Sequence, residues 1–267
     1  MKSARETTAL VTALRGFPAE PAPAALLPEV LRRLGLGDAY WRLESPVGPV
    51  FVAHSKAGIS MVTRASSAAE FERAFERRFG REVRPEKSPA PARVRELVRN
   101  VRGRGRLALR YDLRGLSEFE RSVLLKALEI PSGEVRPYSW IAREIGHPGA
   151  VRAAGSALAK NPVPLLIPCH RVVRSDGRIG KYSLGGARNK RRLLEVEGTR
   201  PALLERLAAS GIRYLGNPDS RGFCYPTCGG VDALVRTNTV RFRTEREAIA
   251  AGFHPCRACR PPVAAAG

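Results

Sequence analysis

The alternation of apolar and polar positions predicts a small sheet followed by a helix in the first half of the chain. Residues 41–63 contain three short segments of this kind, separated by turns rich in Gly and Pro. Such alternation is typical of strands with one buried face. Further on, Phe71, Phe75 and Phe79 recur every four residues within 67–79, which is the spacing of one helical face. We therefore expect a strand-rich unit completed by a helix.

Helical patterns follow in the centre of the chain. Ser117 and Glu120 have the spacing of a capping box and predict a helix that runs to about residue 128. Two further helices are expected at 138–144 and 150–160, separated by the break Gly-His-Pro-Gly. Two helices across a tight break form a helix-turn-helix pattern. Many helical hairpins share this pattern without binding anything, so it predicts the helices and not their role.

The remaining segments are less regular. Residues 1–36 are rich in Ala and Pro, with one short amphipathic helix predicted at 26–34, and we expect a flexible extension without assigned function. Residues 88–91 (Ser-Pro-Ala-Pro) indicate a linker before an Arg-rich helix, and 101–112 could add one further strand.

The charge balance indicates a polyanionic partner. The 267 residues include 46 Lys and Arg against 25 acidic residues, which gives a net charge of +21. Nucleic acid is the first expectation for such a chain, ahead of a membrane surface. A GC-rich genome is the alternative explanation, because Arg outnumbers Lys 39 to 7. The sequence lacks a signal peptide and an apolar run long enough to cross a bilayer, so we expect a cytoplasmic protein, associated with the nucleoid.

One cysteine stands apart from the other four. Cys169 follows an apolar run and directly precedes His170. A thiolate is the reactive form of cysteine, and an adjacent imidazole is a common means of producing one. The alternative is a buried structural cysteine with a chance neighbour, because free Cys is among the most buried residue types.

The other four cysteines have the spacing of a zinc site. Three residues separate the first pair, two separate the second pair, and 27 lie between the pairs: Cys224, Cys228, Cys256 and Cys259. This is a strong four-cysteine zinc pattern. A structural Zn²⁺ ion would stabilise a region of about 50 residues that has little core of its own.

The residues around Cys169 resemble a known family. The run from 161 to 198 contains NPVP, IPCHRVV, SDG, KYS and the closing LL and EG, and upstream segments include Tyr-Ser at 138 and Gly-Ser-Ala-Leu at 155. Over residues 116–198 the chain is similar to the O6-alkylguanine-DNA alkyltransferases. The resemblance implies DNA repair by irreversible transfer of an alkyl group from O6-alkylguanine, and from O4-alkylthymine, to Cys169. It also implies a single turnover without a cofactor, double-stranded alkylated DNA as partner, and a monomer.

The resemblance assigns roles around the thiol. His170 would act as the base through a bridging water, and Glu197 would orient the imidazole. Tyr138 would donate to the flipped guanine and stabilise the leaving anion, and Asn161 would organise the active-site loop. Three further positions match residues that line the pocket: Pro164, Tyr182 and Ser183. Each of these has a structural alternative, such as a helix cap for Asn161 or a surface charge for Glu197. Leu184 departs from the family pattern and leaves the shape of the pocket wall open.

The helix expected at 150–160 has one side made of small residues, from which Arg152 projects. The small residues are Ala150, Ala153, Gly155 and Ser156. Close helix packing would explain them equally well. The family resemblance implies that this helix lies in the minor groove of DNA and that Arg152 enters the base stack as the target nucleotide rotates out.

The C-terminal sequence GFCYPTC, followed by AAGFHPCRACRP, resembles the zinc domain of the adaptive-response (Ada) regulator. That resemblance implies methyl acceptance from DNA phosphotriesters at Cys224. Residues 229–231 (Gly-Gly-Val) replace arginines of the regulator, which leaves this second activity open, and the order of the two domains is reversed.

Together these patterns predict an α+β protein in four parts. We expect an extension at 1–36, an α/β domain at 37–112, a helical catalytic domain with a helix-turn-helix at 113–200 and an Ada-like zinc domain at 208–262. The competing functions are an alkyl-lesion sensor that transfers nothing and a zinc-dependent transcriptional regulator. Lesion sensors of this kind lack the reactive cysteine, whereas this chain has Cys169.

Overall fold

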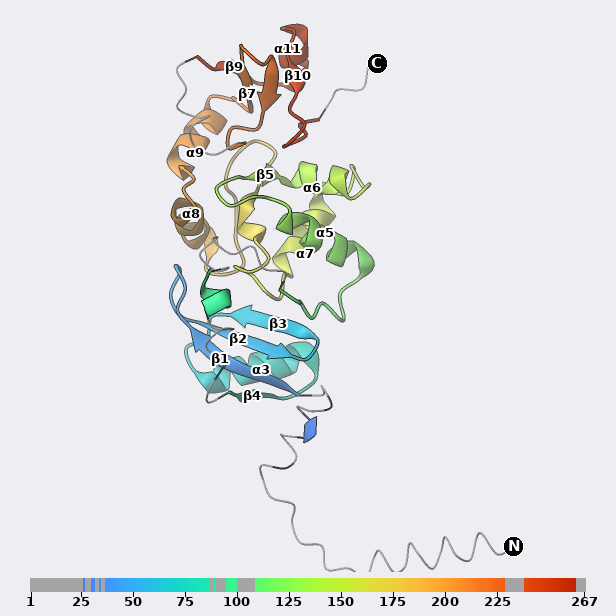
Figure 1. Ribbon diagram of the computed structural model, residues 1–267, viewed down its shortest axis with the longest axis vertical. Coiled ribbons are helices and arrows are strands. Elements are labelled where there is room, and N and C mark those ends of the chain that lie inside the picture. The colour runs from blue at the N-terminus through green and yellow to red at the C-terminus, as the bar shows by residue number, and fades with distance from the viewer. Residues whose placement is uncertain are drawn as a thin grey trace, which may run out of the picture.

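The computed structural model describes residues 37–86, 95–99, 109–228 and 238–262, with isolated positions at 26, 30, 31, 34 and 89. Along the long axis lie a sheet with its helix, a central group of helices, and a small sheet with one helix (Figure 1). The fold is therefore of the α+β class, as predicted. Most residues of the helix expected at 26–34, of the linker at 88–91 and of the strand expected at 101–112 lie outside the described residues.

The N-terminal sheet contains the three predicted strands and a fourth. Its order is β3-β2-β1-β4. Its strands are β1 (Asp38–Leu43), β2 (Val50–Ser55), β3 (Gly58–Thr63) and β4 (Val83–Pro85). Strand β4 was not predicted; it pairs in parallel with β1 and has only three residues. Such a short strand has too few positions to show alternation.

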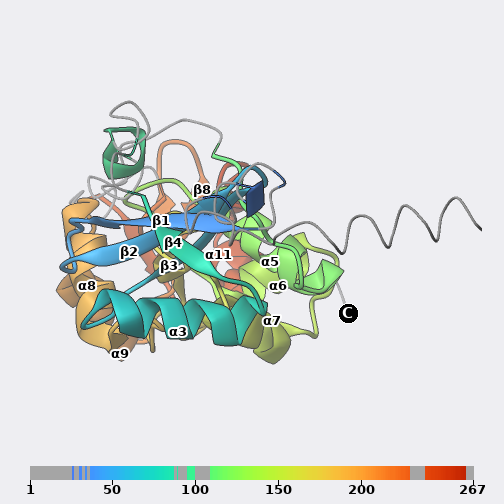
Figure 2. The same cartoon turned by 90° about the horizontal axis from the view of Figure 1, so that it is seen from below.

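Helix α3 (Ala68–Phe79) covers one face of this sheet (Figure 2). Ser67 caps its first turn by accepting a hydrogen bond from the amide of Glu70 over 3.2 Å. Phe71 and Phe75 are completely buried against the sheet, and the ring of Phe71 stacks on Phe51 at 5.0 Å between centroids. The predicted helix and its apolar face are both confirmed.

The central helices also match the predictions. Helix α5 (Glu118–Leu128) begins with the predicted capping box of Ser117 and Glu120. Helices α6 (Tyr138–Glu144) and α7 (Val151–Ala159) form the helix-turn-helix. No sequence pattern predicted the two-residue strands β5 (Arg136–Pro137) and β6 (Val172–Val173), which pair in parallel.

The C-terminal part contains helices α8 (Gly186–Val196) and α9 (Pro201–Ala209) and a second sheet. This sheet has the order β10-β8-β7-β9, with helix α11 (Glu245–Ala250) packed against it. Its strands are β7 (Tyr214–Asn217), β8 (Gly222–Cys224), β9 (Val240–Phe242) and β10 (His254–Pro255).

One cluster of buried side chains connects all three parts. It contains Trp41 from the first sheet, Ile141 from the helix-turn-helix and Phe223 from the second sheet. Within the described residues, no helix is long and apolar enough to span a lipid bilayer.

Candidate active site and metal centre

A tight turn before Cys169 is held by Asn161. Leu165 has a φ of 75°, in the left-handed region that is unfavourable for a leucine. The amide oxygen of Asn161 accepts a hydrogen bond from the Val163 amide over 3.0 Å, and its Nδ2 donates to the carbonyl of Ile167, also over 3.0 Å. One side chain therefore spans the turn and compensates for the strained backbone.

The same Asn161 side chain reaches the candidate nucleophile. Cys169 begins a single 3-10 turn (Cys169–Arg171), and Asn161 Nδ2 donates to its Sγ over 3.2 Å. Burial raises the pKa of the Cys169 thiol, while the Asn161 hydrogen bond and the charge of Lys190 act in the opposite direction. The resting side chain is therefore a thiol that must lose its proton before it can attack.

His170 is oriented by a carboxylate. Its Nε2 lies 2.9 Å from Glu197 Oε1, and both side chains are almost completely buried. Nε2 donates this hydrogen bond, so Nδ1 is the ring nitrogen that can accept a proton. Burial lowers the pKa of His170, and its attraction to Glu197 opposes that shift. The imidazole is therefore neutral and can act as a base.

Arg171 holds the carboxylate of Glu197 in place. Its guanidinium makes two hydrogen bonds to the carboxylate, at 2.9 and 2.8 Å, and a third to the carbonyl of Ile130 at 2.7 Å. Burial alone would raise the pKa of Glu197, but hydrogen bonds from His170 and Arg171, together with the charge of Arg171, lower it to about 2. The carboxylate is thus ionised at neutral pH.

A buried lysine lies close enough to the thiol to interact with its charge. Lys190 on α8 has no exposed surface, and its Nζ donates to the carbonyl of Val172 over 2.6 Å. Burial lowers its pKa to about 8, although a negative charge on Cys169 would raise it. Lys190 is therefore mostly charged at pH 7 and stabilises a thiolate at Cys169.

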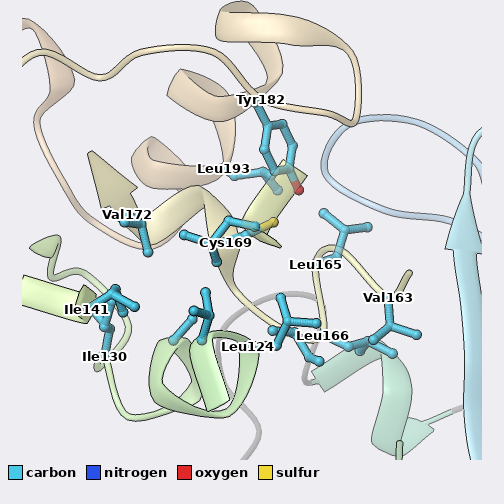
Figure 3. Close-up of a cluster of buried hydrophobic side chains, with 14 of the residues drawn as sticks. Leu124, Ile130, Ile141, Val163, Leu165, Leu166, Cys169, Val172, Tyr182 and Leu193 are labelled. Carbon is cyan, nitrogen blue, oxygen red and sulfur yellow. The ribbon is translucent and has the colours of Figure 1, made fainter. Parts of the chain in front are cut away.

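Cys169 opens into a cavity of about 260 Å³. Its lining comes from α6, α7 and the segment before α8: Tyr138, Gly155, Leu158, Ala159, Cys169, Lys181, Tyr182 and Ser183. In Figure 3 the sulfur of Cys169 and the hydroxyl of Tyr182 lie on the same side of the buried apolar cluster. Burial raises the pKa of both Tyr138 and Tyr182, so both keep their hydroxyl protons and can donate hydrogen bonds.

The outer face of α7 lies beside this cavity. Arg152, Ala153 and Ser156 are exposed, whereas Gly155 is half-buried and contributes to the cavity wall. A side chain at Gly155 would meet the Tyr138 ring at 3.9 Å, an ordinary contact distance. The predicted small-residue side of α7 is therefore an accessible surface and not a helix-packing interface.

The four remaining cysteines converge on one point. Their sulfur atoms all lie within 4.8 Å of one another, and the sulfurs of Cys228 and Cys256 are 3.9 Å apart. Zn²⁺ with Zn–S bonds of about 2.3 Å would separate tetrahedral sulfurs by slightly less than 4 Å. The residues fit a structural zinc ion, which would hold the two cysteine loops together.

Two family descriptions match the chain in succession. Residues 118–199 match "6-O-methylguanine DNA methyltransferase, DNA binding domain", and residues 202–262 match "Metal binding domain of Ada". A crystal structure of a Mycobacterium tuberculosis OGT in complex with DNA is 32% identical, with a TM-score of 0.50, and the match covers 60% of this chain and 92% of that one. The chain belongs to the O6-methylguanine-DNA methyltransferase family and carries a C-terminal zinc-binding domain of the Ada type.

Named relatives agree with this assignment. A methylated-DNA–protein-cysteine methyltransferase of Methanothermobacter thermautotrophicus is 49% identical over 87 residues, which is 33% of this chain and 48% of the relative. The protein of the same name from Rattus norvegicus is 49% identical over 92 residues, which is 34% of this chain and 44% of the relative. The chain thus spans about half the length of these relatives.

The structure brings together most of the residues predicted for the reaction. Tyr138, Tyr182 and Ser183 line the cavity with Cys169, and Asn161 contacts the sulfur directly. Pro164 is buried outside the cavity lining and forms a bridge with Ile167. Leu184 is buried in the core cluster. The roles of all these residues remain predictions.

Two residues of the site were missed. Arg171 lies in the motif IPCHRVV but was not predicted to have a role, and no role was predicted for Lys190. A signal for Lys190 was present: it precedes Leu193 and Leu194 by three and four residues, so it lies on the apolar face of α8. A charged residue on the buried face of a helix indicates a specific partner.

Proposed function

We propose that this protein removes alkyl groups from O6 of guanine, and from O4 of thymine, in double-stranded DNA by transferring them to Cys169. The observation that carries the proposal is the cavity in which Cys169 and Tyr138 share a wall beside the exposed face of α7. A flipped nucleotide could enter such a cavity from DNA bound along that face. We also propose that the protein acts as a monomer in the cytoplasm, in association with the nucleoid.

The reaction follows from the geometry of the site. The thiol proton of Cys169 passes to His170 Nδ1, through a bridging water as in the family, and Lys190 stabilises the thiolate. The sulfur attacks the alkyl carbon, the C–S bond forms and the C–O6 bond breaks. Its electron pair remains on the guanine, where a hydrogen bond from the Tyr138 hydroxyl stabilises the anion. The thioether has no route back to a thiol, so each molecule acts once.

Arg152 would fill the space left by the rotated nucleotide. It is exposed at the start of α7, and the small residues around it permit close approach of the helix to DNA. Inserting a side chain at a base step has an unstacking cost of about a few kcal/mol, which contacts along the groove would offset.

The zinc region would bind DNA and accept a methyl group from phosphotriesters at Cys224. The zinc ion would keep the sulfur deprotonated at neutral pH. Cys224 is half-buried, as are Cys228 and Cys256, whereas Cys259 is buried. The partial exposure of Cys224 therefore permits the reaction, but it does not distinguish Cys224 from Cys228 and Cys256 as the methyl acceptor. Residues 229–231, where the sequence departs from that of the Ada regulator, lie outside the described residues.

Both activities are tested by locating the methyl group. The protein is incubated with duplex DNA that carries either O6-methylguanine or a methyl phosphotriester, and methyl-cysteine is located by peptide mass spectrometry. We expect methyl on Cys169 from the first substrate and on Cys224 from the second. An unmodified Cys169 would make the protein a lesion sensor, and an unmodified Cys224 would leave the zinc centre with a structural role.

A further inference from the structure

A metal-ligand loop contacts the segment that leads into Tyr138. Thr227 lies between the ligands Cys224 and Cys228 and is completely buried. The amide of Val135 donates a hydrogen bond to Thr227 Oγ1 over 2.8 Å, and the hydroxyl lies 3.4 Å from the carbonyl of Val135. The Val135 amide therefore finds its hydrogen-bond partner in the metal-binding region.

The second metal-ligand loop contacts the helix that begins at Tyr138. Arg260 directly follows the ligand Cys259, and its guanidinium lies 2.7 Å from Glu144 and 5.6 Å from the centre of the Trp140 ring. Its carbonyl accepts a hydrogen bond from the Arg143 guanidinium. All three contacts are to α6. The two metal loops thus hold both ends of one continuous segment, residues 135–144.

This segment connects the metal-binding region to the reactive thiol. Tyr138 follows β5 directly, and its ring lines the same cavity as Cys169. On the other side, β5 pairs with β6, which begins at the residue after the Cys169–Arg171 turn. A ladder of two residue pairs is too short to be stable alone, so the position of Tyr138 depends on contacts from outside the ladder.

We propose that Thr227 and Arg260 are positioning residues for alkyl transfer, through which the zinc-binding region sets the distance between Tyr138 and Cys169. This inference rests on the proposed function. A metal ion bound by all four cysteines fixes both loops at once, because two of its ligands come from each loop. The zinc-binding region thereby supports the reaction at Cys169 in addition to any contact it makes with DNA.

The test compares two substitutions of Thr227 in the full-length protein. Thr227→Val keeps the shape of the side chain but removes the hydroxyl, whereas Thr227→Ser keeps the hydroxyl. The rate of transfer from duplex O6-methylguanine is measured with zinc content checked for each variant. We expect Thr227→Val to react about tenfold more slowly, because the buried Val135 amide loses its partner. Thr227→Ser should stay within about twofold of the wild-type rate.

A second reaction distinguishes a change in the position of Tyr138 from a general disruption of the site around Cys169. Iodoacetamide alkylates Cys169 without needing Tyr138, and modification of this cysteine is followed by peptide mass spectrometry. We expect its rate to be the same in Thr227→Val and the wild type. Hydrogen exchange gives a readout independent of activity: the Val135 amide should exchange faster in Thr227→Val, while α5 should be unchanged.

Arg260 provides an independent variant with a matched control. Arg260→Gln should slow transfer from O6-methylguanine by about threefold or more, because it removes two partly exposed ion pairs, with Glu144 and Glu129, and a cation–π contact with Trp140. Arg257→Gln removes the same charge from the same loop, where Arg257 is exposed and makes no ion pair among the described residues. This control should react at the wild-type rate.

The outcomes separate the two proposals. A wild-type protein that does not react with O6-methylguanine would overturn the proposed function and this inference with it. A reactive wild type with equal rates for Thr227→Val, Arg260→Gln and Arg257→Gln would overturn the positioning role alone. Equal slowing with iodoacetamide would also overturn it, since the substitutions would then act on the whole site.

Discussion

His170 Nε2 lies 2.9 Å from Glu197 Oε1, and Arg171 donates hydrogen bonds to both oxygens of the same carboxylate. This relationship fixes the imidazole so that Nδ1 is left as the proton acceptor. It also joins the 3-10 turn at Cys169 to the end of α8, although the two residues are 27 positions apart in the chain. The orientation of the base therefore depends on α8 remaining in place.

Replacing Cys169 with alanine should separate binding from chemistry. Cys169→Ala removes the atom that accepts the alkyl group but leaves α7 and its exposed surface unchanged. We expect transfer from O6-methylguanine to be abolished, while binding of the alkylated duplex, measured by fluorescence anisotropy, stays within about threefold of the wild type. Transfer that survives this substitution would show that another residue is the acceptor.

Arg152→Ala should affect duplex DNA more than the free base. The arginine acts only when a nucleotide leaves a base stack, and free O6-benzylguanine has no stack to leave. We expect the reaction with duplex to slow by tenfold or more, since loss of about 1.4 kcal/mol corresponds to a factor of ten. The reaction with free base should not change. Arg188→Ala on the exposed surface of α8 is the charge-matched control, and equal slowing on both substrates would refute the role in flipping.

Glu197→Gln should lower stability in a pH-dependent manner. The folded-state pKa of Glu197 is lowered from 4.5 to about 2. A lowered pKa of a carboxyl group stabilises the folded protein above its unfolded value of 4.5, and this stabilisation is lost as the pH falls toward 2. From this shift we expect Glu197→Gln to unfold more easily by on the order of 3 kcal/mol at pH 7.

Urea denaturation of the wild type and Glu197→Gln at several pH values measures this effect. The difference in unfolding free energy should decrease steadily below pH 4.5. Glu195→Gln, at an exposed position two residues earlier, should show little difference at any of these pH values. A constant difference between the wild type and Glu197→Gln would mean that the carboxylate is not charged in the folded protein.

Lys190→Met should slow transfer by raising the pKa of Cys169. The substitution keeps most of the buried volume and removes the charge that stabilises the thiolate. Because the pKa of Lys190 is about 8, the wild type loses this charge as the pH rises past that value. We expect the ratio of wild-type to variant rates to be largest near pH 7 and to fall above pH 8. A ratio independent of pH would indicate a packing role instead.

Removing zinc should unfold the metal-binding region and loosen β5. Without the ion, four adjacent thiols lack the bonds that hold the two loops together. After treatment with a chelator we expect amide protection to be lost after about residue 210 and to decrease in Val135 and Arg136. Helix α5 should remain protected and serve as the internal reference. Full protection of Val135 in the zinc-free protein would contradict the coupling between the two regions.

The sequence by itself determined those strands and helices that are specified by a pattern of neighbouring residues. The strands β2 and β3 lie within the strand-rich region predicted at 41–63, and the helix α6 falls on its predicted residues, because side-chain alternation and helix boundaries depend on near neighbours. Four cysteines at two short spacings were enough to predict the metal site, and the motif around Cys169 was enough to indicate the family. Each of these depends on residue types at fixed distances along the chain.

Only the tertiary structure decided the interactions between distant residues. The parallel strand β4 and the pair β5–β6 have two or three residues each, too few to show a pattern. The burial of Lys190 beside Cys169 and the contact of Thr227 with Val135 join segments 21 and 92 residues apart. Such contacts depend on how the helices and sheets pack against one another, because their energy comes from excluding water and pairing buried polar groups.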